Sequence, residues 1–168
     1  MRMARCARLT TAYGIPLEVR PITVADRDRL AAAFELLSER SRHNRFLGPK
    51  PRLSDSELTY LTDVDHRSHE ALAAIDPSDG ALVGVARYAT PQGESGMADM
   101  ALFVVDLWQG QGIGTMLARR LLARAAENGI ARLTATTFAD NGPARAVLRR
   151  LGFRTTWFGA GVIELALG

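Results

Sequence analysis

The spacing of apolar and polar residues predicts a series of short strands, separated first by turns and later by helices. Apolar or alternating runs, which are typical of strands, cover residues 17–22, 69–75, 81–89, 100–105, 132–138, 153–158 and 162–167. Apolar residues at helical spacing predict helices over residues 23–38, 39–46, 54–61, 113–128 and 140–151. Early hairpins and later strand–helix–strand crossovers predict a mixed α/β (α+β) fold. We expect a central mixed, mostly antiparallel sheet with helices on both faces.

Length and composition predict one domain without a membrane span. The 168 residues, of which 47% are hydrophobic and 23% charged, are typical of an ordinary globular protein. Residues 1–14 show little periodicity and predict a disordered tail, so the domain is expected over residues 15–168. This first segment lacks the continuous apolar core of a secretion signal. No apolar stretch approaches the roughly 20 residues that cross a bilayer.

Charge and cysteine content exclude several classes of function. The net charge is only +3, and Arg2, Arg5 and Arg8 lie within the first ten positions. No basic stripe is interleaved with aromatic residues, so we expect no nucleic-acid binding. One cysteine, Cys6, allows no internal disulfide, and this favours a cytoplasmic location. No His/Cys cluster has the spacing of metal ligands, so we expect no metal site.

The stretch from Asp99 to Thr115 combines a strand, a glycine-rich turn and the start of a helix. Its first half is apolar and predicts a buried strand, after which glycines stand at positions 110, 112 and 114. Glycine lets a phosphate approach the backbone, and a helix N-terminus supplies N–H groups with partial positive charge. We therefore predict an anion site. The apolar stripe of the helix consists of Ile113, Met116, Leu117, Leu121, Leu122 and Ala125. Its predicted outer face carries Arg119, Arg120 and Arg124.

Two common phosphate-binding motifs do not fit this stretch. A nucleotide P-loop needs Lys followed by Ser or Thr after its last glycine, whereas Thr115 and Met116 follow Gly114. A dinucleotide fingerprint, G-x-G-x-x-G/A, would place its last small residue at Thr115 or Leu117. The turn also lies late in the chain, whereas that fingerprint usually lies in the first strand–helix unit.

The pattern Gln109-x-x-Gly112-x-Gly114 resembles the acetyl-CoA pyrophosphate loop of the GNAT N-acetyltransferase superfamily. The predicted order of elements from about residue 17 also resembles the GNAT fold. The resemblance implies a sheet that is splayed at the cofactor strand, with acetyl-CoA as co-substrate. It places Leu102, Phe103 and Val104 beside pantetheine. Around the pyrophosphate it places Gln109, Gly110, Gln111, Gly112, Ile113, Gly114 and Thr115.

A second match to the same family lies near the C-terminus. The segment Asn141-x-x-Ala144, followed by Gly152-Phe153, is similar to a family segment in which the Asn contacts the cofactor arm. Asn141 also suits a helix N-cap, and both roles are compatible. The family often has a Tyr seven residues after this Asn, as acid toward the leaving thiolate. Leu148 occupies that position, so a water or a backbone donor would have to serve instead.

A closer resemblance covers residues 38–66. The segments 38–50 and 53–66 are similar to the acetyltransferase domain of bacterial Pat-type protein-lysine acetyltransferases. Those proteins often carry a fused cyclic-nucleotide, amino-acid-binding or acyl-CoA-synthetase-like domain, and no such domain fits in this chain. Within this region, Arg42 and Arg45 either shape the mouth of the acceptor site or form the solvated face of a helix.

Asp99 is the candidate general base. It heads the cofactor strand, where Pat-type domains carry an acidic catalytic base, and strand alternation puts it on one face with Ala101 and Phe103. The alternative is a strand-end carboxylate in solvent. Further candidates for base or acid, each equally suited to a structural role, are His43, His66, His69, Tyr60 and Tyr88.

These observations predict acetyl transfer from acetyl-CoA to an amine, by direct attack in a ternary complex. A protein lysine is the favoured acceptor because of the Pat-type resemblance. The alternatives are a small-molecule amine acceptor and a non-catalytic acyl-CoA-binding module. Acceptor sites are built from variable loops, so the sequence does not identify the acceptor. The last two predicted strands could pair with a second copy, so a homodimer is one expected form.

Overall fold

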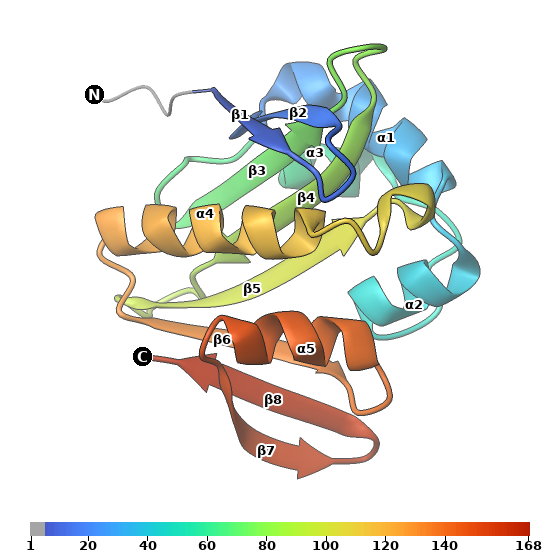
Figure 1. Cartoon of the computed structure of the whole chain (residues 1–168). Coiled ribbons are helices and arrows are strands. Elements are labelled where there is room, and N and C mark those ends of the chain that lie inside the picture. The colour runs from blue at the N-terminus through green and yellow to red at the C-terminus, as the bar shows by residue number, and fades with distance from the viewer. Residues whose placement is uncertain (1–5) are drawn as a thin grey trace.

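Eight strands form one sheet in the computed structural model, which describes residues 6–168 (Figure 1). The strands are β1 (Ala7–Thr10), β2 (Pro16–Pro21), β3 (His69–Ile75), β4 (Leu82–Ala89), β5 (Met97–Val104), β6 (Arg132–Phe138), β7 (Arg154–Gly159) and β8 (Val162–Leu167). Their order across the sheet is β1-β2-β3-β4-β5-β6-β8-β7. Only β5 and β6 pair in parallel among the described strands. The predicted mixed, mostly antiparallel sheet is confirmed.

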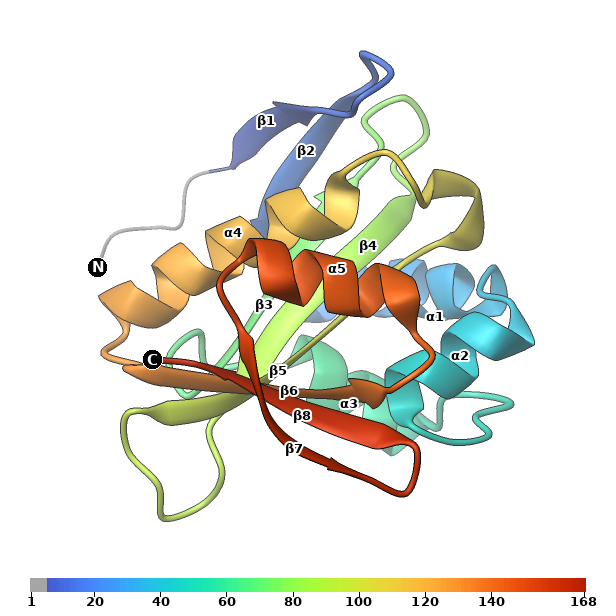
Figure 2. The same ribbon diagram turned by 60° about the horizontal axis from the view of Figure 1, so that its bottom comes forward.

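The helices cover both faces of this sheet, as predicted. They are α1 (Arg27–Glu35), α2 (Glu39–Phe46), α3 (Asp55–Thr62), α4 (Ile113–Glu127) and α5 (Gly142–Arg150), with short 3-10 turns η1 (Val24–Asp26) and η2 (Asp106–Trp108). Figure 2 shows α4 and α5 on one face and α1, α2 and α3 on the other. Each face has its own cluster of buried apolar side chains. Within residues 6–168, none of these helices has the length and apolar character needed to cross a membrane.

The amphipathic pattern of α4 explains how it docks on the sheet. Leu117 and Leu121 are fully buried against the first core cluster, and complete burial of such a side chain contributes about 1.5–3 kcal/mol. The helix ends at Glu127 with Asn128 as its C-cap, and the next residue, Gly129, has φ +77°, a left-handed conformation that glycine adopts without strain. The helix predicted from apolar spacing therefore lies along β3 and β4 with its first residue beside the glycine-rich turn.

The parallel pair β5–β6 opens into a splay. The two strands are paired only from Met97 opposite Arg132 to Asp99 opposite Thr134. Beyond Asp99, β5 continues along β4, whereas β6 continues along β8. The edge of β5 that faces β6 then has no strand partner, so its N–H and C=O groups, apart from Val104 O, which accepts from Gln109 Nε2, are open to another molecule. This is the splayed sheet that the resemblance implied.

Residues 1–14 were expected to be disordered, and for residues 7–10 this prediction is wrong. Strand β1 pairs antiparallel with β2, with Ala7 opposite Val19 and Thr10 opposite Pro16. A four-residue strand is too short to show a clear alternation, and β2 offers it an open edge. Residues 1–5, which the same prediction covers, lie outside the described part of the chain.

Two further predictions need correction. The stretch 23–38 is not one helix, because η1 precedes α1 and the helix ends at Glu35. The strand predicted as buried over residues 100–105 begins at Met97, and residues 101–103 are only half-buried. They remain partly open because β6 has already turned away from β5 at this point.

Arg124 does not lie on the solvent-facing side of α4 as predicted. Its guanidinium turns to the sheet, where Nη2 and Nε donate to Glu70 Oε2 at 3.0 and 3.1 Å. Glu70 is completely buried on β3, and its Oε1 also lies 2.8 Å from His66 Nδ1. A buried carboxylate needs such partners. The arginine therefore neutralises a buried charge and joins α4 to β3.

Candidate active site

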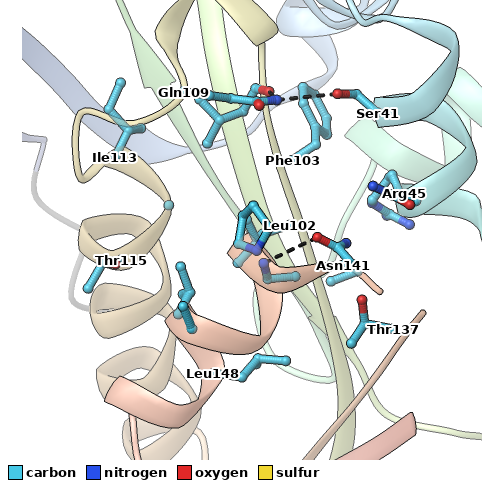
Figure 3. A pocket seen from close by; sticks show the side chains of 18 of the residues that line it. Ser41, Arg45, Leu102, Phe103, Gln109, Ile113, Thr115, Thr137, Asn141 and Leu148 are labelled. Carbon is cyan, nitrogen blue, oxygen red and sulfur yellow. Dashed lines mark hydrogen bonds between the residues drawn. The ribbon is translucent and has the colours of Figure 1, made fainter. Parts of the chain in front are cut away.

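A cavity of about 720 Å³ occupies the splay between β5 and β6. Its walls come from the second half of β5, the turn before α4, the first residues of α4, the middle of β6, α5 and α2. Figure 3 shows Ile113 and Thr115 of α4 on one side of the cavity and Ser41 and Arg45 of α2 on the other. Segments that lie far apart in sequence therefore meet at the splay.

The glycine-rich turn forms the start of α4 at the edge of this cavity. Gly110 and Gly112 have φ of +75° and +83°, and Gly112 is the residue that precedes the first turn of the helix. Gly110, Gly112, Gly114 and Thr115 line the cavity. The first N–H groups of a helix have no partner within the helix, so this end can bind an anion.

Two glutamines that were predicted to contact the cofactor have different positions. Gln109 lines the cavity, but its Nε2 donates to Val104 O at 2.9 Å and to Ser41 Oγ at 3.3 Å. It therefore ties the turn to β5 and to α2. Gln111 is buried and does not line the cavity, while its backbone carbonyl accepts a hydrogen bond from Ala12 N–H at 3.0 Å.

The other predicted cofactor residues come together in the splay. Leu102, Phe103 and Val104 line it from β5, and Asn141 lines it from the start of α5. The Asn141 side chain also accepts a hydrogen bond from Ala144 N–H at 3.3 Å, which is the helix-capping role considered above. Leu148 lies in the wall and is buried, so no hydroxyl acid stands at this position.

Thr137 on β6 lines the cavity and is not among the predicted site residues. Its side chain is 4% exposed, and Oγ1 has no hydrogen-bond partner within residues 6–168. A buried hydroxyl without a partner is costly, so it points to a ligand with a polar group at this place. The sequence signal that could have identified Thr137 is a polar residue at an inward-facing position of the alternating strand β6. The free strand edge, the glycine-rich helix start and this hydroxyl fit an elongated phosphate-containing ligand such as acetyl-CoA.

Asp99 lies at the closed end of the splay. It is the last residue of β5 that pairs with β6, it is exposed, and it accepts a hydrogen bond from Thr134 Oγ1. Asp99 does not line the cavity itself, whereas the next residue, Met100, does. The carboxylate therefore lies beside the point where β5 and β6 separate, next to the cavity residue Met100.

None of the remaining acid–base candidates lines the cavity. Tyr88 is completely buried, and its hydroxyl donates to Arg67 O at 2.9 Å and accepts from Asn128 Nδ2 at 2.7 Å. The His43 ring stacks on Phe138, with centroids 4.8 Å apart. Tyr60 and His69 pack against each other with tilted rings whose centroids are 4.8 Å apart, and His66 forms the contact with Glu70 described above. Within the described residues no group of three or more His, Cys, Asp or Glu side chains could hold a metal ion.

His69 is held in its neutral form by its surroundings. Burial, together with the nearby Arg87 charge, lowers the pKa of His69 from 6.5 to about 4. The lone pair of its Nε2 accepts a hydrogen bond from Arg87 Nη1 at 3.1 Å, which requires a neutral ring. This neutral histidine is not available as a proton donor at neutral pH, and it fixes the guanidinium of Arg87.

We expect His69 to make the protein less stable in acid. Between about pH 6.5 and pH 4 the unfolded chain binds a proton at this ring that the folded chain excludes, so the free energy of unfolding falls as pH falls. His69→Gln keeps an acceptor for Arg87 without a titrating ring, and should flatten this part of the pH profile. Urea unfolding at several pH values measures the slope. His43→Gln is the matched control and should retain the slope, and equal slopes in both variants and the wild type would contradict the assignment.

The comparisons with known sequences agree with the geometry of the site. A family model described as an acetyltransferase (GNAT) domain matches residues 17–154. Acetyltransferase PA5475 of Pseudomonas aeruginosa is 34% identical over 137 residues, which cover 80% of this chain and 73% of that protein. Acetyltransferase Pat of Mycolicibacterium smegmatis is 28% identical over 162 residues, covering 90% of this chain and 48% of that protein. The chain thus spans about half the length of the Mycolicibacterium relative.

A solved structure extends this similarity to three dimensions. The GNAT domain of S. lividans PAT superposes with a TM-score of 0.90 at 30% sequence identity. The superposition covers 96% of each chain. The sheet order and the helices on both faces are therefore those of that domain.

Proposed function

The chain belongs to the GNAT family of acetyltransferases, and we propose that it transfers an acetyl group from acetyl-CoA to the side-chain amine of a protein lysine. The family uses acyl-CoA, and the similar Pat of Mycolicibacterium smegmatis and PAT of S. lividans support the choice of acceptor. The observation that carries the proposal is the cavity in the splay. It joins an anion-binding helix start to a free strand edge and is bounded by α2 on the other face of the sheet.

Each wall of the cavity has a role in this reaction. The helix start at Gly112 to Thr115 binds the pyrophosphate, while Leu102 to Val104 and Thr137 hold the pantetheine arm. Free N–H groups on the open edge of β5 polarise the thioester carbonyl and stabilise the oxyanion. The amine is held against the thioester in one complex, which removes much of the entropic barrier. Asp99 accepts the amine proton through a bridging water.

Labelled acetyl-CoA and a protein extract test the acceptor class. We expect acetyl-lysine peptides, identified by mass spectrometry, above the background of a reaction without the enzyme. A mixture of small amines serves as the parallel acceptor set. Label on small amines alone would favour the small-molecule alternative. Binding of acetyl-CoA without transfer to either set would contradict the proposed reaction and favour a binding module.

Gly112→Ala should weaken acetyl-CoA binding by about tenfold or more, a change of roughly 1.4 kcal/mol. At φ +83° a side chain strains the turn and moves the N–H groups that would bind the pyrophosphate. Calorimetry with acetyl-CoA measures the effect. Gly129→Ala is the matched control, because Gly129 has φ +77° at the opposite end of α4 and equally open surroundings. Equal affinities of the two folded variants would reject the assignment of the loop.

A further inference from the structure

Two arginines on α2 have opposite environments. Arg42 Nη1 donates to Pro51 O at 2.8 Å, and its Nη2 lies 3.6 Å from the Glu35 carboxylate. Arg45 lines the cavity, and its side chain makes no hydrogen bond or ion pair with any residue of the described chain, 6–168. Its guanidinium carbon lies 4.8 Å from the ring centroid of Phe46. The charge of Arg42 is thus paired with the Glu35 carboxylate, whereas the charge of Arg45 is not neutralised by a described residue.

Arg87 on β4 places a second positive charge close to Arg45. Its side chain is buried and donates to Leu61 O at 3.0 Å and His69 Nε2 at 3.1 Å, neither of which is negatively charged. Its neighbour on β5 is Ala101, which lines the cavity. Burial, followed by the Arg45 charge, lowers the pKa of Arg87 to about 9, and burial lowers the pKa of Arg45 to about 10. Both guanidinium groups remain charged at neutral pH.

The carboxylates near the cavity do not neutralise these arginines. Asp106 lines the cavity, but its oxygens accept hydrogen bonds from Ser38 N–H at 2.9 Å and from Ser41 Oγ at 3.1 Å. Asp99 accepts from Thr134 and forms no ion pair with Arg45 or Arg87 among the contacts of the described residues. Arg87 is buried and Arg45 is partly buried, and a cation without a counter-ion in such surroundings is unfavourable, so an anion from outside the chain is the expected partner.

Arg45 lies on the acceptor side of the cavity. The glycine-rich turn and α4 lie on the face that the proposed function assigns to the cofactor, whereas α2 lies on the opposite face (Figure 2). Figure 3 shows the Arg45 side chain across the cavity from Ile113 and Thr115 of that helix start. The guanidinium is therefore placed to bind the molecule that brings the amine.

We propose that the acceptor carries a carboxylate close to its amine, and that Arg45, with Arg87 behind it, binds this carboxylate. The inference rests on the proposed function, and for a protein acceptor it means an aspartate or glutamate beside the modified lysine. The planar guanidinium can donate two parallel hydrogen bonds to a carboxylate, which gives geometric selectivity as well as attraction. Arg45 and Arg87 thus form a site that determines which acceptors the enzyme prefers.

Lysine-centred peptide libraries test this inference on the full chain. Each degenerate library is made in two matched forms, with Glu or with Gln at a flanking position, and initial rates of CoA release give kcat/KM for each form. We expect the Glu form to be preferred by about tenfold, because hydrogen bonds between charged groups are stronger than neutral ones. Arg45→Gln should reduce this ratio to about one, and Arg45→Lys should retain part of it. Arg52→Gln removes the same charge from an exposed position outside the cavity wall and should keep the preference.

Free lysine and lysinamide, assayed in parallel, identify the source of the carboxylate. Arg45-dependent preference for free lysine, without acetylation of peptides, would support the carboxylate site while contradicting a protein acceptor. Equal use of Glu and Gln peptides, or a preference that persists in Arg45→Gln, would overturn the inference and leave the proposed function standing. Weaker acetyl-CoA binding by Arg45→Gln with unchanged peptide preference would assign the arginine to the cofactor and also overturn it. If no amine is acetylated, the proposed function fails, and the inference fails with it.

Discussion

Asp99→Asn should lower turnover at neutral pH by about 10²-fold or more, the usual contribution of a general base. A lysine amine has a reference pKa of about 10.4, so it arrives mainly as ammonium and must lose a proton before attack. The Asn side chain keeps the shape and still accepts the hydrogen bond from Thr134, but it does not accept a proton. Acetyl-CoA affinity should remain nearly unchanged, because Asp99 does not line the cavity. Steady-state rates and calorimetry measure the two effects separately.

The pH profile distinguishes proton transfer from a structural effect of the same substitution. Activity of Asp99→Asn should recover partly at high pH, where free amine forms without a base. Asp140→Asn is the charge-matched control, because Asp140 is exposed and lies outside the cavity wall, and it should keep the wild-type rate. A wild-type rate in Asp99→Asn at neutral pH would exclude this carboxylate as the base. The exposed imidazole of His43 would then be the next group to test, because His69 is held neutral by its surroundings.

Glu70→Ala should destabilise the fold by about 3 kcal/mol, because removing one partner of a buried ion pair leaves the other uncompensated. Glu70 is completely buried, and Arg124, which is 22% exposed, loses two charge-assisted hydrogen bonds in the variant. His66 loses its partner as well. Urea unfolding should show a lower midpoint with an unchanged m-value. The cavity residues are not altered, so activity of the folded fraction should persist.

Glu127→Ala provides the control for this effect on the same arginine. Glu127 Oε2 lies 2.6 Å from Arg124 Nη1, but the carboxylate is 63% exposed, and exposed ion pairs contribute only about 0–1 kcal/mol. Glu70→Ala and Glu127→Ala each remove one of the two carboxylates that pair with the Arg124 guanidinium. Equal losses of stability would show that burial of Glu70 is not the cause.

Local patterns in the sequence predicted most of the elements correctly. The strand over residues 132–138 and the last strand over 162–167 match β6 and β8. The helix predicted from residue 54 begins with a capping box, in which Ser54 Oγ accepts from Glu57 N–H at 3.2 Å and Glu57 Oε2 accepts from Ser54 N–H at 2.7 Å. These features depend on residues within a few positions of each other, so their physical causes are visible in the chain itself. β1 was missed because four residues carry too little periodicity.

The glycine-rich turn was also predicted from the sequence. Spacing at Gly110, Gly112 and Gly114 excluded two common nucleotide motifs, and the positive φ at the first two confirms that this turn needs glycine. The likeness to the GNAT family, shown by the match over residues 17–154, then supplied the class of reaction. What the sequence determined is therefore the order of the elements and the glycine-rich turn at one edge of the cavity.

Only the tertiary structure decided which polar side chains are available to a substrate. Arg42 and Arg45 look equivalent in sequence, yet Arg42 contacts Pro51 and Glu35 outside its helix, while Arg45 lines the cavity. Arg124 was placed in solvent by helical spacing, and a carboxylate 54 residues earlier draws it to the sheet. Whether a charge is neutralised depends on contacts between distant segments. Such contacts are set by how α2, α4 and the strands pack, which no local pattern of residues records.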